Sequence, residues 1–279
     1  MNWIDLDWLV VVPTLVGAFV LGAVIGSFAC CQAWRLRLKE QGKPVKNQRS
    51  ICLNCKEQLK WYENIPIVSW IMQRGRCRKC RAKIGGAEIL SEIGLGLTFV
   101  ALTLDACVGG LLANESSATI WALLSLVLLL TLATLHLVLL IYDAKWGRLP
   151  NRLLLEAVGV ALIYALCQIF QDTTTLWPTV GAVGLLAGVY YLLYFGSHEK
   201  LVGSGDWLLA LSIALVLGHW WLAIVELFLA NALALFWNLP KIFKKGRKKQ
   251  VYFGPFLIIA GLVIFLLRTW LLGLVAGLL

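Results

Sequence analysis

Long apolar runs alternate with short polar segments along this chain, and the pattern predicts its secondary structure. About 20 apolar residues allow a helix to cross the roughly 30 Å hydrocarbon layer of a bilayer. The runs predict an all-α polytopic membrane protein with about eight transmembrane helices. The sixth run is short and could join the seventh in one bent element around Gly218 and His219. The expected spans are 9–33, 89–112, 121–141, 153–170, 177–195, 207–217, 220–237 and 256–278.

The composition supports a membrane protein. Hydrophobic residues make up 60% of the 279 residues and charged residues 14%, with a mean hydropathy of +0.80. A soluble protein of this length does not need so much apolar surface for its core. A strongly positive net charge, here +10, is common in nucleic-acid-binding proteins. The positions of the basic residues decide whether that interpretation applies.

The basic residues divide between the two sides of the expected membrane. Of the 25 Lys and Arg residues, 14 lie between positions 35 and 83, and 24 lie in segments that would share one side. Basic residues are retained on the cytoplasmic side, so we expect a multi-pass protein with both termini on the extracytoplasmic side. The opposite side carries no basic residue and four acidic ones: Asp5, Asp7, Glu115 and Asp172.

Two acidic residues at span ends are the candidates for chemistry. Asp143 ends the third span, and Asp206 begins the sixth span after a Gly-Ser-Gly run. The expected topology places both residues at the cytoplasmic face. Ionisable residues in or near membrane spans are functional candidates by default. Two neighbouring carboxyl groups can hydrolyse an amide, because one activates water while the other remains protonated.

The simpler alternative is that each Asp is a solvated residue that caps a helix end. The surrounding residues favour a functional pair. Gly203 and Gly205 carry no side chain, so backbone or substrate can approach Asp206 closely. Pro150 breaks the chain after Asp143 and lets the next span begin. We therefore predict that these two glycines and Pro150 support the site or bind the substrate.

The segment between the first two spans contains two Cys-x-x-Cys pairs, Cys52 with Cys55 and Cys77 with Cys80. Each pair is followed by a cation and then by an apolar residue at the same offset, so the segment contains a small internal repeat. Four thiolates with this spacing predict a tetrahedral, structural zinc site in a small zinc-ribbon-like lobe. Disulfides are the poorer interpretation, because this loop is expected in the reducing cytosol.

An aromatic stretch, residues 61–70, lies between the two cysteine pairs. It could line a peptide-binding surface, or it could form the small core of the lobe and lie against lipid headgroups. The basic residues around it can attract anionic lipid. Nucleic acid is the less favoured partner, because the lobe is held between two spans.

Several residues inside the spans have mainly structural interpretations. Gly22, Gly26 and Ser27 form a small-residue face suited to close helix packing. His136 lies on about the same helix face as Asp143, and a bond to a neighbouring helix is its preferred role. The remaining cysteines, 30, 31, 107 and 167, are interpreted as small residues without a metal. Four further polar residues could support the site or link helices: Glu92, Glu156, Glu226 and Asn231.

Together these motifs resemble those of the type IV prepilin peptidases, membrane aspartyl enzymes that process pilin and type II secretion pseudopilin precursors. The resemblance covers nearly the whole chain. The matching motifs are, in order, Gly26-Ser27-Phe28 with Arg35, the two cysteine pairs with residues 61–78, Asp143 with Leu149-Pro150-Asn151, the Gly-x-Gly-Asp ending at Asp206, and residues 252–257.

The resemblance implies an aspartic endopeptidase of the bacterial inner membrane. It would cleave the short basic leader from a prepilin or pseudopilin at the cytoplasmic face, with Asp143 and Asp206 as the catalytic pair. Members of the family often also methylate the new N-terminus with S-adenosylmethionine. The expected cofactors are structural zinc and S-adenosylmethionine, and the expected partners are the precursor and membrane lipids. The expected divisions are a first helix (1–34), a zinc-binding lobe (35–88) and a protease core (89–279).

The chain departs from the family pattern at three places, none of which affects the two Asp or the four Cys. Cys30 replaces a usual Asn, Leu208 replaces a Lys that often follows the catalytic Asp, and residues 87–89 replace an Arg-Tyr-Pro-like run. These departures concern the methyltransferase activity more than the protease. Two alternatives remain: a non-catalytic zinc-lobed assembly factor, and a methyltransferase without protease activity.

Overall fold

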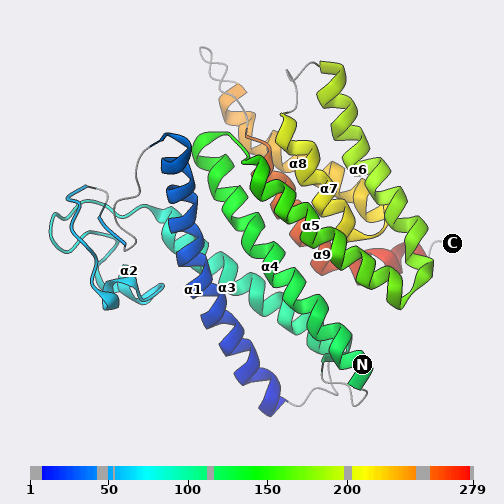
Figure 1. Ribbon diagram of the computed structural model, residues 1–279, viewed down its shortest axis with the longest axis horizontal. Helices are drawn as coiled ribbons and strands as arrows, with labels where there is room; N and C mark the ends of the chain where they lie inside the picture. The colour runs from blue at the N-terminus through cyan, green and yellow to red at the C-terminus, as the bar shows by residue number, and fades with distance from the viewer. Residues whose placement is uncertain are drawn as a thin grey trace. The chain divides into compact units, whose positions relative to one another are not determined.

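The computed structural model describes residues 8–42, 50–52, 54–111, 116–197, 203–242 and 252–276. Within these residues the regular structure is helical, apart from two isolated β-bridges in the lobe between α1 and α3 (Figure 1). The predicted all-α fold is confirmed. The helices are α1 (Trp8–Glu40), α2 (Val68–Met72), α3 (Gly86–Ala106), α4 (Ser116–Trp146), α5 (Asn151–Gln171), α6 (Leu176–Ser197), α7 (Ser204–Leu217), α8 (Trp220–Ile242) and α9 (Gly254–Ala276), with short turns η2 (Trp61–Asn64), η3 (Cys107–Leu111) and η4 (Thr173–Thr175).

Seven of the described helices are long and apolar enough to cross a membrane, so the chain is a multi-pass membrane protein. The eighth apolar helix, α7, has 14 residues and rises about 21 Å, which is less than the thickness of the hydrocarbon layer. Gly218 adopts the left-handed conformation (φ +63°) between the end of α7 and the start of α8. The sixth and seventh runs are therefore separate helices.

Two helices extend beyond their predicted apolar runs. α1 continues to Glu40 and α4 continues to Trp146, so Asp143 lies inside α4. Basic residues occupy the last turn of both helices: Arg37 and Lys39 in α1, and Lys145 in α4. Cations near a helix C-terminus interact favourably with the helix dipole, which explains why each helix outlasts its apolar stretch.

The chain divides into two compact units, residues 1–122 and 123–279. The first contains α1, the lobe and α3, and the second contains α5 to α9; α4 begins in the first unit and continues in the second. The predicted boundaries after residues 34 and 88 separate the first helix, the zinc-binding lobe and the protease core. They stay predictions. The membrane orientation also stays a prediction, and several charges behind it lie outside the described residues: Asp5, Asp7, Glu115, Lys200 and the basic residues of 244–249.

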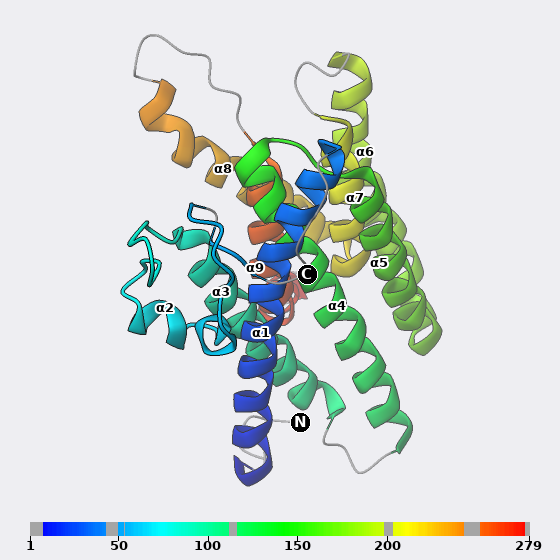
Figure 2. The same cartoon turned by 60° about the vertical axis from the view of Figure 1, so that its left-hand side comes forward.

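In the first unit, α1 packs closely along α3 (Figure 2). A Cβ atom added at Gly22 would lie 2.7 Å from the carbonyl oxygen of Leu95, and one added at Gly26 would overlap the main chain of Ser91. The two helices approach so closely only because these positions lack side chains. The predicted packing role of both glycines is confirmed.

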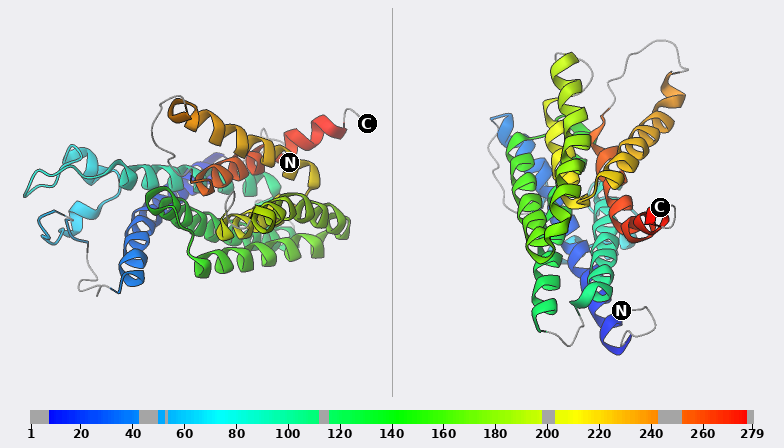
Figure 3. Two further views of the ribbon diagram at one scale, coloured as in Figure 1. Left: turned by 90° about the horizontal axis from the view of Figure 1, so that it is seen from above. Right: turned by 90° about the vertical axis from the view of Figure 1, so that its right-hand side faces the viewer.

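In the second unit, α7 is enclosed by its neighbours. It packs against α5, α6 and α9, as the yellow helix in Figure 3 shows. His136 on α4 shares a hydrogen bond with Ser212 on α7 (Nε2 to Oγ, 3.0 Å), which confirms its predicted role as a link between helices. Burial on several sides explains why α7 is almost entirely apolar after its first turn. The fully buried positions of α7 are Leu209, Ala210, Ser212 and Ala214.

We expect the variant Gly26→Ala to lower the stability of the protein by roughly 1–3 kcal/mol, because its methyl group overlaps the main chain of α3. The measurement is the thermal unfolding midpoint of the protein in detergent. The matched control is Gly17→Ala on the same helix, where no atom lies within 4 Å of the added carbon. Equal midpoints for the two variants would contradict the packing role of Gly26.

Candidate active site and metal centre

Asp143 is buried, with 5% of its surface exposed. Its Oδ2 accepts a hydrogen bond from the main-chain N–H of Gly254, the first residue of α9, over 3.0 Å. The solvated-cap alternative therefore does not describe Asp143. A buried carboxylate needs polar partners, and an amide at a helix N-terminus is a favourable one.

Two glycines allow the chain to close around Asp143. A Cβ atom at Gly254 would lie 2.8 Å from Oδ2 of Asp143, so a side chain there would displace the carboxylate. Gly147 ends the turn after α4 with φ +62°, and Tyr252 lies directly against it. The start of α9 is thus fitted onto the end of α4. This explains why residues 252–254 belong with Asp143, a link that sequence spacing does not reveal.

Asp206 lies in the first turn of α7 and is partly buried. Its Oδ2 accepts a hydrogen bond from the main-chain N–H of Gly203 over 3.0 Å. The absence of a side chain matters more at Gly205, where an added Cβ would lie 2.7 Å from the Cβ of Leu149. Gly203 has room for a side chain, because its nearest neighbour, Oδ2 of Asp206, would lie 3.5 Å from an added Cβ.

The turn after Asp143 reaches α7 through Leu149. Pro150 is the N-cap of α5, with φ −68°, and its carbonyl accepts the N–H of Leu154. Leu154 and Leu149 both lie against Gly205. The structure therefore brings Pro150, Gly205 and both Asp residues into one region of the second unit.

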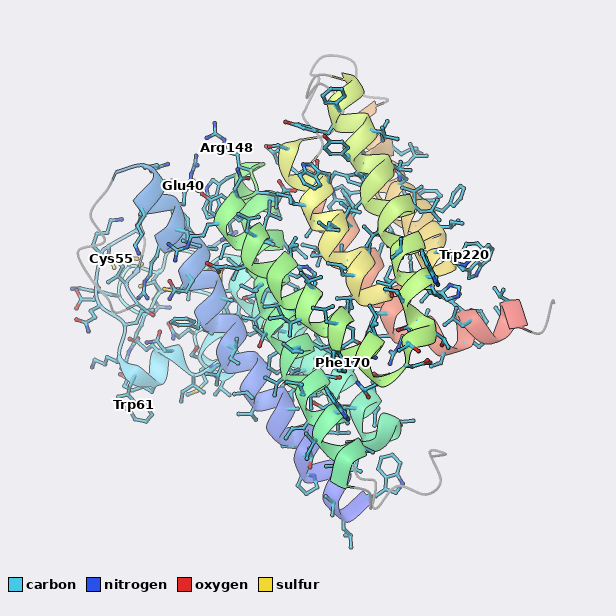
Figure 4. The ribbon with its side chains drawn as sticks, turned by 45° about the vertical axis from the view of Figure 1, so that its right-hand side comes forward. Glu40, Cys55, Trp61, Arg148, Phe170 and Trp220 are labelled. Atoms are coloured by element: carbon cyan, nitrogen blue, oxygen red, sulfur yellow. The ribbon has the colours of Figure 1, made fainter. Side chains whose placement is uncertain are left out.

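The two carboxyl groups lie close enough for the charge of Asp206 to act on Asp143. Each has one oxygen held by a main-chain amide, and in the described part of the chain no hydrogen bond is made to the other oxygen. They are carried by the end of α4 and the start of α7, which lie at the end of the second unit that Arg148 marks in Figure 4, away from Phe170 and Trp220. Two such carboxyl groups can hold and activate a water molecule between them.

Three polar residues near the pair come from α6 and α8. Tyr190 is buried, and the charges of both Asp206 and Glu226 act on its hydroxyl group. Asn231 donates a hydrogen bond to the hydroxyl oxygen of Tyr190 (3.3 Å). The ring of Tyr190 lies 5.6 Å from that of Phe253, which directly precedes Gly254. Tyr190 thus supports the turn whose amide binds Asp143.

The sequence pattern predicts a supporting role as one interpretation of Glu226, and it predicts no role for Tyr190. Glu226 is fully buried, and neither carboxyl oxygen has a hydrogen-bond partner among the described residues. The position of Glu226 inside an apolar span is the sequence feature that marks it as a candidate. Tyr190 lies in a run of tyrosine and leucine residues that gives no comparable signal.

In the first unit, the four sulfur atoms of Cys52, Cys55, Cys77 and Cys80 lie within 4.8 Å of one another (Cys55 is labelled in Figure 4). The sulfurs of Cys52 and Cys80 are 3.8 Å apart. Thiolates placed tetrahedrally at about 2.3 Å from a shared ion are separated by about this distance. The cluster can therefore hold a metal ion.

The predicted internal repeat is present in the main chain. In both cysteine pairs the residue after the second Cys, Lys56 or Arg81, has φ +60° and donates its N–H to the carbonyl of the first Cys over 2.9 Å. Asn54 donates to the sulfur of Cys80 and lowers the pKa of that thiol to about 6. The thiolate form that binds metal is favoured as a result.

The fold and these side chains define a polytopic helical membrane protein with a paired-carboxylate site of the kind that aspartic peptidases use, and with a separate four-cysteine cluster. Family models place the chain more narrowly. The model of the bacterial peptidase A24 N-terminal domain matches residues 20–106, and the model of the type IV leader peptidase family matches residues 130–239. The first range contains the four cysteines of the cluster, and the second contains Asp143 and Asp206.

Curated relatives agree with these models. A prepilin leader peptidase/N-methyltransferase of Aeromonas hydrophila is 33% identical over 76% of this chain and 69% of its own length. One of Dickeya chrysanthemi is 27% identical over 92% of this chain and 94% of its own length. A type 4 prepilin-like proteins leader peptide-processing enzyme of Escherichia coli is 29% identical over 90% of this chain and 93% of its own length. No solved structure matches the chain. The chain belongs to the type IV leader peptidase family, and it is a peptidase.

We expect Gly205→Ala to lower the thermal unfolding midpoint, because the added methyl group overlaps Leu149 where α7 meets the turn after α4. Overpacking of this kind typically reduces stability by roughly 1–3 kcal/mol. The matched control in the same segment is Gly203→Ala, which has space for the methyl group and should leave the midpoint unchanged. A loss of stability in Gly203→Ala alone would contradict the packing role of Gly205.

Proposed function

We propose that this protein is an integral membrane aspartic endopeptidase that cleaves the leader peptide from type IV prepilins or pseudopilins. The observation that carries the proposal is the juxtaposition of Asp143 and Asp206, which come from separate helices and each have one oxygen without a hydrogen-bond partner among the described residues. The names of the relatives, which are prepilin leader peptidases, support the substrate class.

In the proposed reaction one carboxylate removes a proton from a water molecule, and the water oxygen attacks the carbonyl carbon of the scissile amide. The other carboxyl group is protonated and donates a hydrogen bond to the carbonyl oxygen. Collapse of the tetrahedral intermediate breaks the C–N bond, and the leaving amine takes up a proton from the pair. The two acids titrate as a coupled pair, so the roles of base and acid belong to the pair.

The main-chain amides have a defined part in this mechanism. The N–H of Gly254 and the N–H of Gly203 each hold one carboxyl oxygen and thereby fix the plane of the carboxyl group. The two remaining oxygens can then face the same water molecule. Such fixed orientation reduces the reorganisation that the reaction requires.

The finer assignments form part of the same proposal. Cleavage takes place at the cytoplasmic face of the bacterial inner membrane, with both termini on the other side, as the distribution of basic residues indicates. Methylation of the new N-terminus with S-adenosylmethionine is a second activity, supported by the methyltransferase part of the relatives' names. The expected partners are the precursor and membrane lipids.

We further propose that the four-cysteine cluster holds a structural zinc ion. Zinc prefers four thiolates in a tetrahedral arrangement, and a site closed by four protein ligands has no open position for a reacting water. The ion would hold the two halves of the internal repeat together through Cys52 and Cys55 on one side and Cys77 and Cys80 on the other. It therefore supports the lobe and takes no part in peptide hydrolysis.

We expect Asp143→Asn and Asp206→Asn each to reduce cleavage of a purified prepilin in liposomes by at least about 10²-fold, because an amide cannot serve as acid or base. The matched control is Asp172→Asn in the turn between α5 and α6, where the carboxylate accepts hydrogen bonds from the N–H and the hydroxyl group of Thr174. All variants should retain their thermal midpoint and bound metal.

The two alternative functions give different results in this assay. A non-catalytic assembly factor predicts that no form of the protein, wild type included, cleaves the precursor. A methyltransferase without protease activity predicts methyl transfer to pre-cleaved pilin and no cleavage. Wild-type rates in either Asp variant would overturn the paired-carboxylate mechanism.

We expect the purified protein to contain one zinc ion per chain, measured by elemental analysis. Cys80→Ser should abolish binding and increase the proteolytic sensitivity of the lobe, whereas the control Cys167→Ser, outside the cluster, should change neither. Removal of zinc with a chelator should reproduce the effect of Cys80→Ser. Unchanged zinc content in Cys80→Ser would contradict the four-thiolate site.

A further inference from the structure

The lobe of the first unit carries large apolar side chains on its surface. Trp61 is 79% exposed and Met72 is 80% exposed. We call this surface the apolar edge; its residues are Trp61, Ile65, Val68, Ile71 and Met72. The side chains of this edge do not form a core of the lobe, so that interpretation of the aromatic stretch does not apply to them. Exposed apolar surface of this kind marks an interaction site.

The depth of the apolar edge follows from the register of α1 and α3. Oε2 of Glu92 on α3 accepts the main-chain N–H of Ile67 over 2.6 Å, so Ile67 lies at the level of Glu92. At this level α3 contacts Gly26 of α1. The first charged residue of α1 after its apolar run is Arg35, nine residues or about 14 Å further along the helix.

Other observations agree with this depth. Phe28 on α1 and Leu90 on α3 are exposed close to the same level, as expected of side chains that face lipid. In Figure 4, Trp61 lies beside the middle part of α1, whereas Cys55 lies nearer to the end marked by Glu40. The lobe therefore reaches back along the two spans, with its apolar edge beside their apolar portions.

The charge of the lobe fits an anionic lipid surface. Residues 50–85 contain eight basic and two acidic residues. Two of the cations, Lys60 and Arg78, lie 5.9 and 5.8 Å from the ring centre of Tyr62, next to Trp61. Aromatic residues bordered by cations are typical of the boundary between hydrocarbon and headgroups.

A constrained turn sets the direction of the edge. Ile67 has φ +62° and ψ −53°, a conformation that a β-branched residue rarely adopts, and Val68 donates its N–H to the carbonyl of Pro66 across it. The bond from Ile67 to Glu92 holds this turn against α3. Strained backbone persists where surrounding structure enforces it and commonly marks a functional segment.

We propose that the apolar edge inserts into the adjacent leaflet of the bilayer, with the basic residues of the lobe at the headgroups of anionic lipids. The lobe is then a membrane-seated element, and Glu92 is the positioning residue that sets its depth. This proposal does not depend on the peptidase activity. It also decides between the two roles of the aromatic stretch, in favour of lipid over peptide.

The test uses the full-length protein in liposomes that contain a clickable phospholipid, with a photo-reactive phenylalanine analogue introduced at Met72. We expect lipid adducts at Met72 to exceed several-fold those at the matched control position Gln58, an exposed polar site on the first cysteine repeat. The yield should rise when zwitterionic lipid is replaced in part by anionic lipid. Bound zinc and the unfolding midpoint report that each protein is folded.

Three outcomes would overturn the proposal. Equal lipid labelling at Met72 and Gln58 would show that the apolar edge does not insert into the bilayer. Labelling of an added prepilin at Met72, with loss of the lipid adduct, would show a peptide-binding surface. Yields independent of lipid charge would exclude the headgroup contribution. In addition, Glu92→Ala should lower lipid labelling at Met72, whereas Glu92→Gln, which can still accept the bond from Ile67, should retain it.

Discussion

The contact of Gly205 with Leu149 is the constraint on which the candidate active site depends. It allows the start of α7 to pack directly against the turn that follows Asp143, with no side chain between them. Asp206, the next residue, is thereby held beside the end of α4. This close approach connects the two sequence motifs that carry the acids. A larger residue at position 205 would separate them.

A second close contact, between the start of α9 and the end of α4, also positions Asp143. The first residue of α9, Gly254, donates its N–H to Asp143, and Tyr252 fills the space above Gly147. Tyr190 then packs behind Phe253, and Asn231 anchors its hydroxyl group. Segments far apart in sequence thus meet at one buried carboxylate. Among the described residues, main-chain amides and not cations supply the hydrogen bonds to both carboxyl groups.

Hydropathy predicted the helices well, since each long apolar run became a helix. It misjudged their ends at Glu40 and Trp146, because charged residues in a last turn extend a helix beyond its apolar part. The Cys-x-x-Cys spacing predicted the sulfur cluster, because a short repeat fixes local geometry. The roles of Tyr190, Gly254 and Glu92 depend on contacts between segments distant in sequence, and no local pattern reports them. Gly203 and Gly205 looked equivalent in sequence, yet only Gly205 is closely packed.

The length of α7 explains how a membrane enzyme can keep its acids below the surface. Its rise of about 21 Å falls about 9 Å short of the hydrocarbon thickness. Trp220, the first residue of α8, is 43% exposed and suits a membrane boundary near the end of α7. The deficit then falls at the other end, where Asp206 begins the helix. Asp143 is likewise placed inside α4 and not beyond it. Under the proposed function, this places both carboxyl groups near the level where a precursor's apolar helix would meet its polar leader.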